Sequence, residues 1–131
     1  MGMTPGKRIL VADDEPDLLQ SVAAVLRDIG AEVVCAGSGA ELIKKMADEG
    51  PFALVVADIS MPWMSGLHAM QSARFAGLAT PIVVITALTD PEIDERVRAL
   101  GRDAVLLRKP FNLESLVNAV ETLLGPGQSA A

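Results

Sequence analysis

Near its start the chain reads Ile9-Leu10-Val11-Ala12-Asp13-Asp14-Glu15-Pro16, which is four apolar residues, three acidic residues and a proline. A short apolar run without polar alternation is typical of a strand that is buried on both faces, as in parallel sheets. Asp14 or Glu15 is expected to cap a helix directly afterwards, with Pro16 in its first turn. The stretch therefore predicts a strand followed by a helix, with carboxylates at the junction.

Three further apolar runs end next to a polar residue in the same way. They are residues 52–57 before Asp58, residues 82–85 before Thr86, and residues 104–107 before Arg108 and Lys109. Residues 32–36 predict one more strand. Because the runs are almost entirely apolar, we expect strands of a parallel sheet that are buried on both faces.

Apolar residues at helical spacing lie between the strands. The expected helices cover about residues 16–29, 40–48, 67–75, 91–100 and 113–124. Ser38 and Asn112 are expected to cap the second and the last of them. Strands that alternate with helices predict an α/β fold with a doubly wound parallel sheet and right-handed crossovers. One domain is expected over residues 7–124, and residues 125–131 predict a flexible tail or the start of a linker.

The composition favours a globular domain and argues against nucleic-acid binding. Of the 131 residues, 50% are hydrophobic, which is enough to form a core. The charged fraction of 21% is too low for a disordered chain. With 17 acidic and 11 basic residues, the net charge is −6. Such a domain lacks the basic surface that a direct nucleic-acid binder needs.

Cysteine usage and hydropathy bear on the compartment. Cys35 is the single cysteine, which excludes an internal disulfide and is compatible with a reducing cytosol. No apolar stretch reaches the roughly 18–20 residues of a membrane span, and the first residues do not resemble a signal peptide. We therefore expect a cytoplasmic domain without membrane contact.

The polar residues that follow the strands are predicted to meet. The carboxyl ends of parallel strands share one edge of the sheet, which brings together Asp13, Asp14, Asp58, Thr86 and Lys109. Three clustered carboxylates repel one another unless a cation lies between them, and Mg²⁺ prefers such hard oxygen ligands. The hydroxyl and the ammonium group can hold an anion beside the cation.

Four motifs stand in this order along the chain: Val11-Ala12-Asp13-Asp14-Glu15-Pro16, residues 58–66, Thr86-Ala87 and Lys109-Pro110-Phe111. Together they resemble the receiver domain of two-component response regulators. Each motif follows its own predicted strand, and the resemblance covers about residues 7 to 124. It implies a five-stranded parallel sheet in the order 2-1-3-4-5, flanked by five helices. It also implies a signalling domain rather than an enzyme.

The resemblance implies how the phosphoryl group would be held. Asp58 would accept it from a histidine of a partner histidine kinase or histidine phosphotransfer protein. Thr86 and Lys109 would contact the phosphoryl oxygens. The Lys109-Pro110 peptide bond would be cis, as in similar domains.

The resemblance also implies a set of Mg²⁺ ligands. Asp14 and Asp58 would bind the ion directly, and Asp13 would act through a bound water. The backbone carbonyl of Ser60 would supply a further oxygen. Because a carboxylate and a phosphoryl group repel each other, the cation would make the transfer possible.

The chain departs from the family pattern at two places. One is the loop Gly101-Arg102-Asp103-Ala104, which is about one residue longer than usual before the lysine, and the other lies on the last predicted strand. Similar domains often carry Tyr or Phe three residues before the lysine, where the ring changes rotamer as the domain switches, and here the residue is Leu106. We expect a switch centred on residues 86–100 that does not use a ring, with a phosphate-sink receiver as the alternative. His68 is expected on a helix surface without a role. Trp63 could be a packing residue or a partner contact.

Two other classes of protein remain alternatives. A Mg²⁺-dependent aspartate-nucleophile phosphatase uses a similar acid, threonine and lysine set, but it carries an aspartate where this chain has Ser60. A flavin-binding domain of flavodoxin type has the same topology, but its first loop is rich in Ser, Thr and Gly. Here that loop is Asp13-Asp14-Glu15, which repels phosphate in the absence of a cation.

Overall fold

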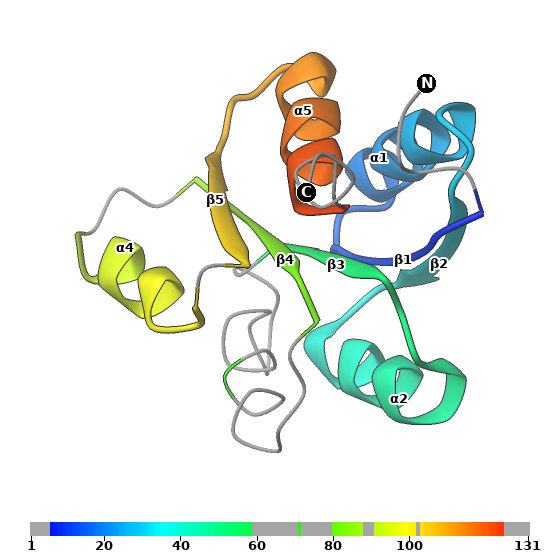
Figure 1. The fold of residues 1–131 in the computed structure, drawn as a ribbon, viewed down its shortest axis with the longest axis horizontal. Helices are drawn as coiled ribbons and strands as arrows, with labels where there is room; N and C mark the ends of the chain where they lie inside the picture. Colours follow the sequence, from blue (N-terminus) through cyan, green and yellow to red (C-terminus); the bar gives the residue numbers. More distant parts are fainter. Residues whose placement is uncertain (1–5, 59–70, 72–79, 88–90, 102, 125–131) are drawn as a thin grey trace, which may run out of the picture.

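The computed structural model of the chain describes residues 6–58, 71, 80–87, 91–101 and 103–124. Strands and helices alternate along them (Figure 1). The elements are β1 (Arg8–Ala12), α1 (Pro16–Asp28), β2 (Glu32–Ala36), α2 (Gly39–Glu49), β3 (Leu54–Asp58), β4 (Ile82–Thr86), α4 (Pro91–Arg98), β5 (Ala104–Arg108) and α5 (Leu113–Leu124). Four of the five expected helices are therefore described. The remaining one, expected at residues 67–75, lies outside the described residues except for Gln71, which is helical. Ser60, Trp63, His68 and the tail also lie outside them.

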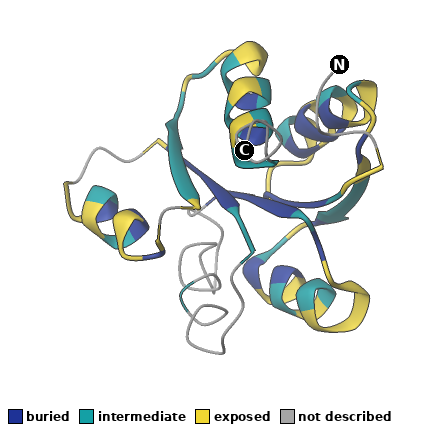
Figure 2. Cartoon of the chain, viewed as in Figure 1, coloured by how far each residue is buried: buried dark blue, intermediate teal, exposed yellow. Residues whose placement is uncertain are grey.

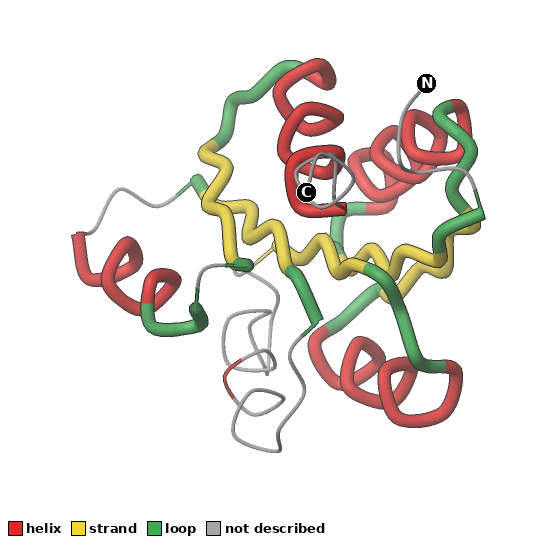
Figure 3. Tube along the Cα trace, in the orientation of Figure 1, coloured by secondary structure: helices red, strands yellow, loops and turns green. Residues whose placement is uncertain are grey.

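The five strands form one parallel sheet in the order β2-β1-β3-β4-β5, which confirms the expected topology. Figure 3 shows the strands as one layer with helices on both sides. The chain changes direction across the sheet between β1 and β3, because β2 lies on one side of β1 and β3 on the other. At such a switch point the loops beyond the carboxyl ends of the strands diverge and leave room for a ligand.

Two helices cover each face of the sheet within the described part of the chain (Figure 1). The helices α1 and α5 lie on one face, and α2 and α4 lie on the other. Alternate residues of the strands point to the two faces, so Leu10 and Ile9 belong to different apolar clusters. All residues of β3 and β4 are buried, which confirms the predicted double coverage for the centre of the sheet.

The prediction of complete burial is wrong for β5. All five of its residues are only partly buried, and Figure 2 shows the strand in the intermediate colour. The reason is topological, because β5 lies at the edge of the sheet and pairs only with β4. A run of apolar residues does not distinguish an edge strand from a central one when the edge strand still packs on helices.

The helix ends confirm most of the predicted caps. The Ser38 hydroxyl accepts a hydrogen bond from the backbone N–H of Glu41 at 3.1 Å, and the Asn112 side chain accepts one from Ser115 at 2.7 Å. Gly30 follows α1 with φ of 101°, a conformation that favours glycine. Glu15 stands at the N-cap of α1, but its side chain makes no capping hydrogen bond. No helix in the described segments is long and apolar enough to cross a membrane.

Candidate functional site

Three acidic side chains meet where β1 and β3 end. Carboxylate oxygens of Asp13, Asp14 and Asp58 all lie within 4.8 Å of one another. The register of the two strands causes this, because Ala12 is paired with Ala57 and the acidic residues come next. Asp13 is 3% exposed and Asp58 is 1% exposed, whereas Asp14 is exposed. Two buried carboxylates and one exposed carboxylate thus form an acidic group at the switch point of the sheet.

Lys109 brings a positive charge to this group. Its Nζ atom lies 2.6 Å from Oδ2 of Asp58 and 3.2 Å from Oε1 of Glu15. The residue directly follows β5, and its backbone N–H donates to the carbonyl oxygen of Thr86 at 2.7 Å. The Lys109-Pro110 peptide bond is cis, as the resemblance implies.

Thr86 completes the set that the sequence places at this edge. It is the last residue of β4 and is fully buried. Its neighbour Ile85 is paired with Asp58 across the sheet, so the ends of β3 and β4 lie side by side. Five of the six predicted site residues are therefore at one edge of the sheet. The sixth, Ser60, falls outside the described residues.

The charges at the site favour a cation. Burial raises the pKa of Asp13; the hydrogen bond from the Glu15 backbone lowers it in part, and the nearby Asp58 carboxylate raises it further. Burial alone would lower the pKa of Lys109, but hydrogen bonds to Asp58 and Glu15 outweigh it and raise that pKa above its ordinary value. Lys109 is therefore charged at neutral pH, and the cluster still carries more negative than positive charge.

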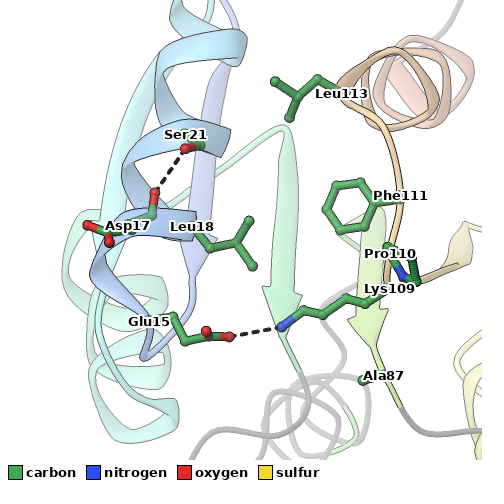
Figure 4. Close-up of a pocket in the computed structure, with 9 residues that line it drawn as sticks. All are labelled: Glu15, Asp17, Leu18, Ser21, Ala87, Lys109, Pro110, Phe111 and Leu113. Carbon is green, nitrogen blue, oxygen red and sulfur yellow. Dashed lines mark hydrogen bonds and ion pairs between the residues drawn. The ribbon is translucent and has the colours of Figure 1, made fainter.

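A pocket of about 620 Å³ opens beside Lys109. The start of α1 forms one wall and the segment between β5 and α5 forms the other (Figure 4). The lining residues are Glu15, Asp17, Leu18, Ser21, Ala87, Lys109, Pro110, Phe111 and Leu113. The Lys109 ammonium can thus be reached from solvent along this pocket, while Asp58 lies deeper.

Sequence reasoning missed the role of Glu15 in this arrangement. It gave Asp14 or Glu15 as the helix cap and no other role for Glu15, whereas the Glu15 carboxylate forms an ion pair with Lys109. The available signal was an acidic residue directly after the pair Asp13-Asp14. Only the three-dimensional fold places this residue opposite a lysine that is 94 positions away.

Comparison with known proteins identifies the family. The sequence pattern of the response regulator receiver domain matches residues 9–121. Transcriptional regulatory protein PdtaR of Mycobacterium tuberculosis is 36% identical over 116 residues, which cover 88% of this chain and 55% of PdtaR. Response regulator receiver protein CpdR of Brucella abortus is 34% identical over 118 residues, which cover 90% of this chain and 97% of CpdR.

A solved structure agrees with these relatives. The response regulator receiver domain protein (CheY-like) from Methanospirillum hungatei matches with a TM-score of 0.85 and 26% identity, covering 96% of this chain and 99% of that one. The chain thus spans about half the length of PdtaR, nearly all of CpdR and nearly all of the solved domain. The chain belongs to the response regulator receiver domain family of two-component signalling systems.

Proposed function

We propose that the chain is a phosphoacceptor in which Asp58 takes a phosphoryl group from a phosphohistidine of a partner kinase or phosphotransfer protein. The observation that supports this most directly is the Lys109 ammonium 2.6 Å from a buried Asp58, beside two further carboxylates. The charge and hydrogen-bonding groups for a transferred phosphoryl group are thus assembled around one candidate nucleophile.

The metal ion of this proposal is Mg²⁺. The donor set fits it, because Asp13, Asp14 and Asp58 offer carboxylate oxygens within 4.8 Å of one another and Lys109 compensates only part of their charge. The backbone carbonyl of Ser60 belongs to the proposed ligand set. When bound, the ion would reduce the repulsion between Asp58 and the phosphoryl group. Asp14→Ala should weaken Mg²⁺ binding at least tenfold (about 1.4 kcal/mol) in calorimetry; equal affinities would remove Asp14 from the site.

The side chains of the chain would act in the following way. A carboxylate oxygen of Asp58 forms a bond to phosphorus while the bond to the imidazole nitrogen of the donor breaks. The electron pair of that bond leaves with the imidazole. Lys109 balances the charge on the phosphoryl oxygens, and Thr86 at the end of β4 donates a hydrogen bond to one of them.

The signal would then pass to the β5 edge. The backbone N–H of Lys109 donates a hydrogen bond to the carbonyl oxygen of Thr86. The preceding residue, Arg108, forms an ion pair with Asp94 of α4. Leu106, at the position of the family aromatic, packs partly buried against the cluster that contains Ile93 and Val97. A movement of Lys109 toward a phosphoryl group would thus reach α4 by polar and apolar contacts. The surface of α4, β5 and α5 is the partner face in this proposal.

Phosphorylation of the protein tests the proposal. The protein is incubated with Mg²⁺ and acetyl phosphate, and intact mass is followed over time. We expect one phosphoryl group on the wild type and on the control Asp48→Asn, which changes an exposed acid of α2, and none on Asp58→Asn. A phosphoryl group that persists in Asp58→Asn would contradict the assignment.

The same preparation distinguishes the phosphoacceptor from a phosphatase and from a phosphate-sink receiver. A phosphatase would turn over a phosphomonoester many times, whereas a phosphoacceptor is labelled once per molecule. A phosphate sink would be labelled without any change in amide hydrogen exchange at α4 and β5.

A further inference from the structure

Glu15 stands at the N-cap of α1, but its side chain does not cap the helix. At the N-cap of a helix, a short polar side chain normally accepts a hydrogen bond from the first turn. Glu15 makes no such bond, and its carboxylate lies 3.2 Å from the Lys109 ammonium. Figure 4 shows the two side chains reaching toward each other from opposite walls of the pocket.

Lys109 is shared between two carboxylates that face different sides. Asp58 belongs to the buried acidic cluster, and its side chain is 2% exposed. Glu15 lines the pocket, and its side chain is 64% exposed. A phosphate group that enters from the pocket and binds the ammonium group therefore meets the Glu15 carboxylate first. There it either adds a third anionic partner to the Lys109 ammonium beside Glu15 and Asp58 or displaces Glu15 from it, and in both cases it lies next to the Glu15 carboxylate.

The charge of Glu15 makes either arrangement unfavourable. Two like unit charges about 4 Å apart in water reduce an affinity on the order of fivefold, and a dianion is affected more than a monoanion. A free small donor has only its few contacts with the site to offset this repulsion. A donor carried by a partner protein adds the contacts of the whole interface.

We propose that Glu15 is a specificity-determining residue for the phosphodonor. It competes with the donor phosphate for Lys109 and so disfavours small anionic donors relative to a phosphohistidine that a partner protein presents. The inference rests on the proposed phosphoacceptor function and deepens it, since it concerns the choice of donor for the same site.

Glu15→Gln tests the inference, because it removes the charge and keeps the size of the side chain. The control is Asp28→Asn, which removes the same charge from an exposed residue at the other end of α1, about 20 Å from Glu15 along the helix axis. Initial rates are measured over a range of acetyl phosphate, a dianion at neutral pH, and of phosphoramidate, largely a monoanion. Each series is repeated with added KCl.

For Glu15→Gln we expect the half-saturating concentration of acetyl phosphate to fall at least threefold, with the maximal rate within twofold of wild type. The fall should be smaller for phosphoramidate and should shrink with salt. Asp28→Asn should behave as wild type. An unchanged or higher half-saturating concentration, or an equal fall in Asp28→Asn, would overturn the inference. So would a calorimetric Mg²⁺ affinity that rises in Glu15→Gln, since Glu15 would then act through the metal.

A binding measurement separates this inference from the proposed function. Inorganic phosphate is titrated in the presence of Mg²⁺ and followed by NMR shifts of residues around Lys109. Glu15→Gln should bind it at least threefold more tightly than wild type, and this result needs no phosphoryl transfer. If neither donor labels Asp58, the proposed function fails, and the phosphate titration still decides whether Glu15 competes for Lys109.

Discussion

At the centre of the sheet every residue of β3 and β4 is buried, whereas every residue of β5 at the edge is only partly buried. The central strands have backbone partners on both sides and helices on both faces. The edge strand has backbone partners only in β4, and a partly exposed ion pair between Arg108 and Asp94 links its end to α4. Packing thus fixes the centre more firmly than the edge.

The site joins these two regions. Asp58 and Thr86 end the central strands β3 and β4, Asp13 directly follows β1, and Lys109 follows the edge strand. A charge change at Asp58 would therefore act on a lysine whose surroundings can shift at lower cost than those of the acids. The difference teaches that the proposed acceptor, Asp58, lies in the fully buried centre, and that the less buried β5 edge would be suited to carry the proposed response. Four experiments can break or sharpen this comparison.

The largest effect is expected for Lys109→Ala. Removal of the ammonium group next to Asp58 should slow phosphorylation by acetyl phosphate about 10²–10³-fold, because charge on the phosphoryl oxygens is no longer balanced. Intact mass over time measures the rate, and circular dichroism verifies the fold. The control Lys45→Ala removes a lysine that pairs with Glu49 on α2. A loss below tenfold in Lys109→Ala, or an equal loss in Lys45→Ala, would show that the edge does not contribute to the chemistry.

The next effect concerns stability. Leu54→Ala in β3 should lower the free energy of unfolding by about 3 kcal/mol, since the side chain is fully buried and leaves a cavity. Leu106→Ala in β5 removes the same atoms from a partly buried position and should cost about half as much. Urea denaturation measures both. Equal costs would mean that the edge is packed as tightly as the centre.

The sequence predicted the centre better than the edge for a physical reason. An apolar run such as residues 82–85 indicates a buried strand, and the polar residue after the run marks its end. Asp58 and Thr86 were therefore correctly predicted to lie at the ends of strands. The run at residues 104–107 is also entirely apolar, but the burial of β5 depends on its place in the sheet order. Apolar composition does not contain that information.

Side-chain partners across long sequence distances were harder to predict. From the sequence, the Glu15 carboxylate could either cap α1 or form an ion pair. Which of the two occurs depends on where β5 ends, because Lys109 directly follows that strand. The sequence placed Lys109 at the site. That its ammonium group contacts both Asp58 and Glu15 follows from the arrangement of the loops. The ion pair of Arg108 with Asp94 likewise has no local signal in the sequence.

A smaller effect is expected at Asp13 in the absence of metal. Burial raises its pKa in the folded state, so protonation of this group favours folding. That contribution is present below the ordinary carboxyl pKa and is lost as the pH rises through the folded value. As the pH rises through this value, Asp13→Asn should therefore become more stable relative to the wild type. With Mg²⁺ present, the wild type should instead be the more stable of the two. Thermal denaturation at several pH values without and with Mg²⁺ measures it; a constant difference would argue against a charge cost at the buried centre.

The smallest effect on stability, and the most direct test of the edge, is Arg108→Ala. The ion pair with Asp94 is partly exposed, so its loss should cost no more than about 1 kcal/mol in urea denaturation. The response of α4 should change more than the stability does. In the wild type, beryllofluoride with Mg²⁺ should alter amide hydrogen exchange at the site and over residues 91–108. In Arg108→Ala, exchange should still change at the site, but residues 91–98 should respond less, because one of the contacts that link β5 to α4 is missing. If α4 responds as in the wild type, coupling passes through the apolar contacts of Leu106 instead, and Leu106→Ala becomes the variant that must abolish it.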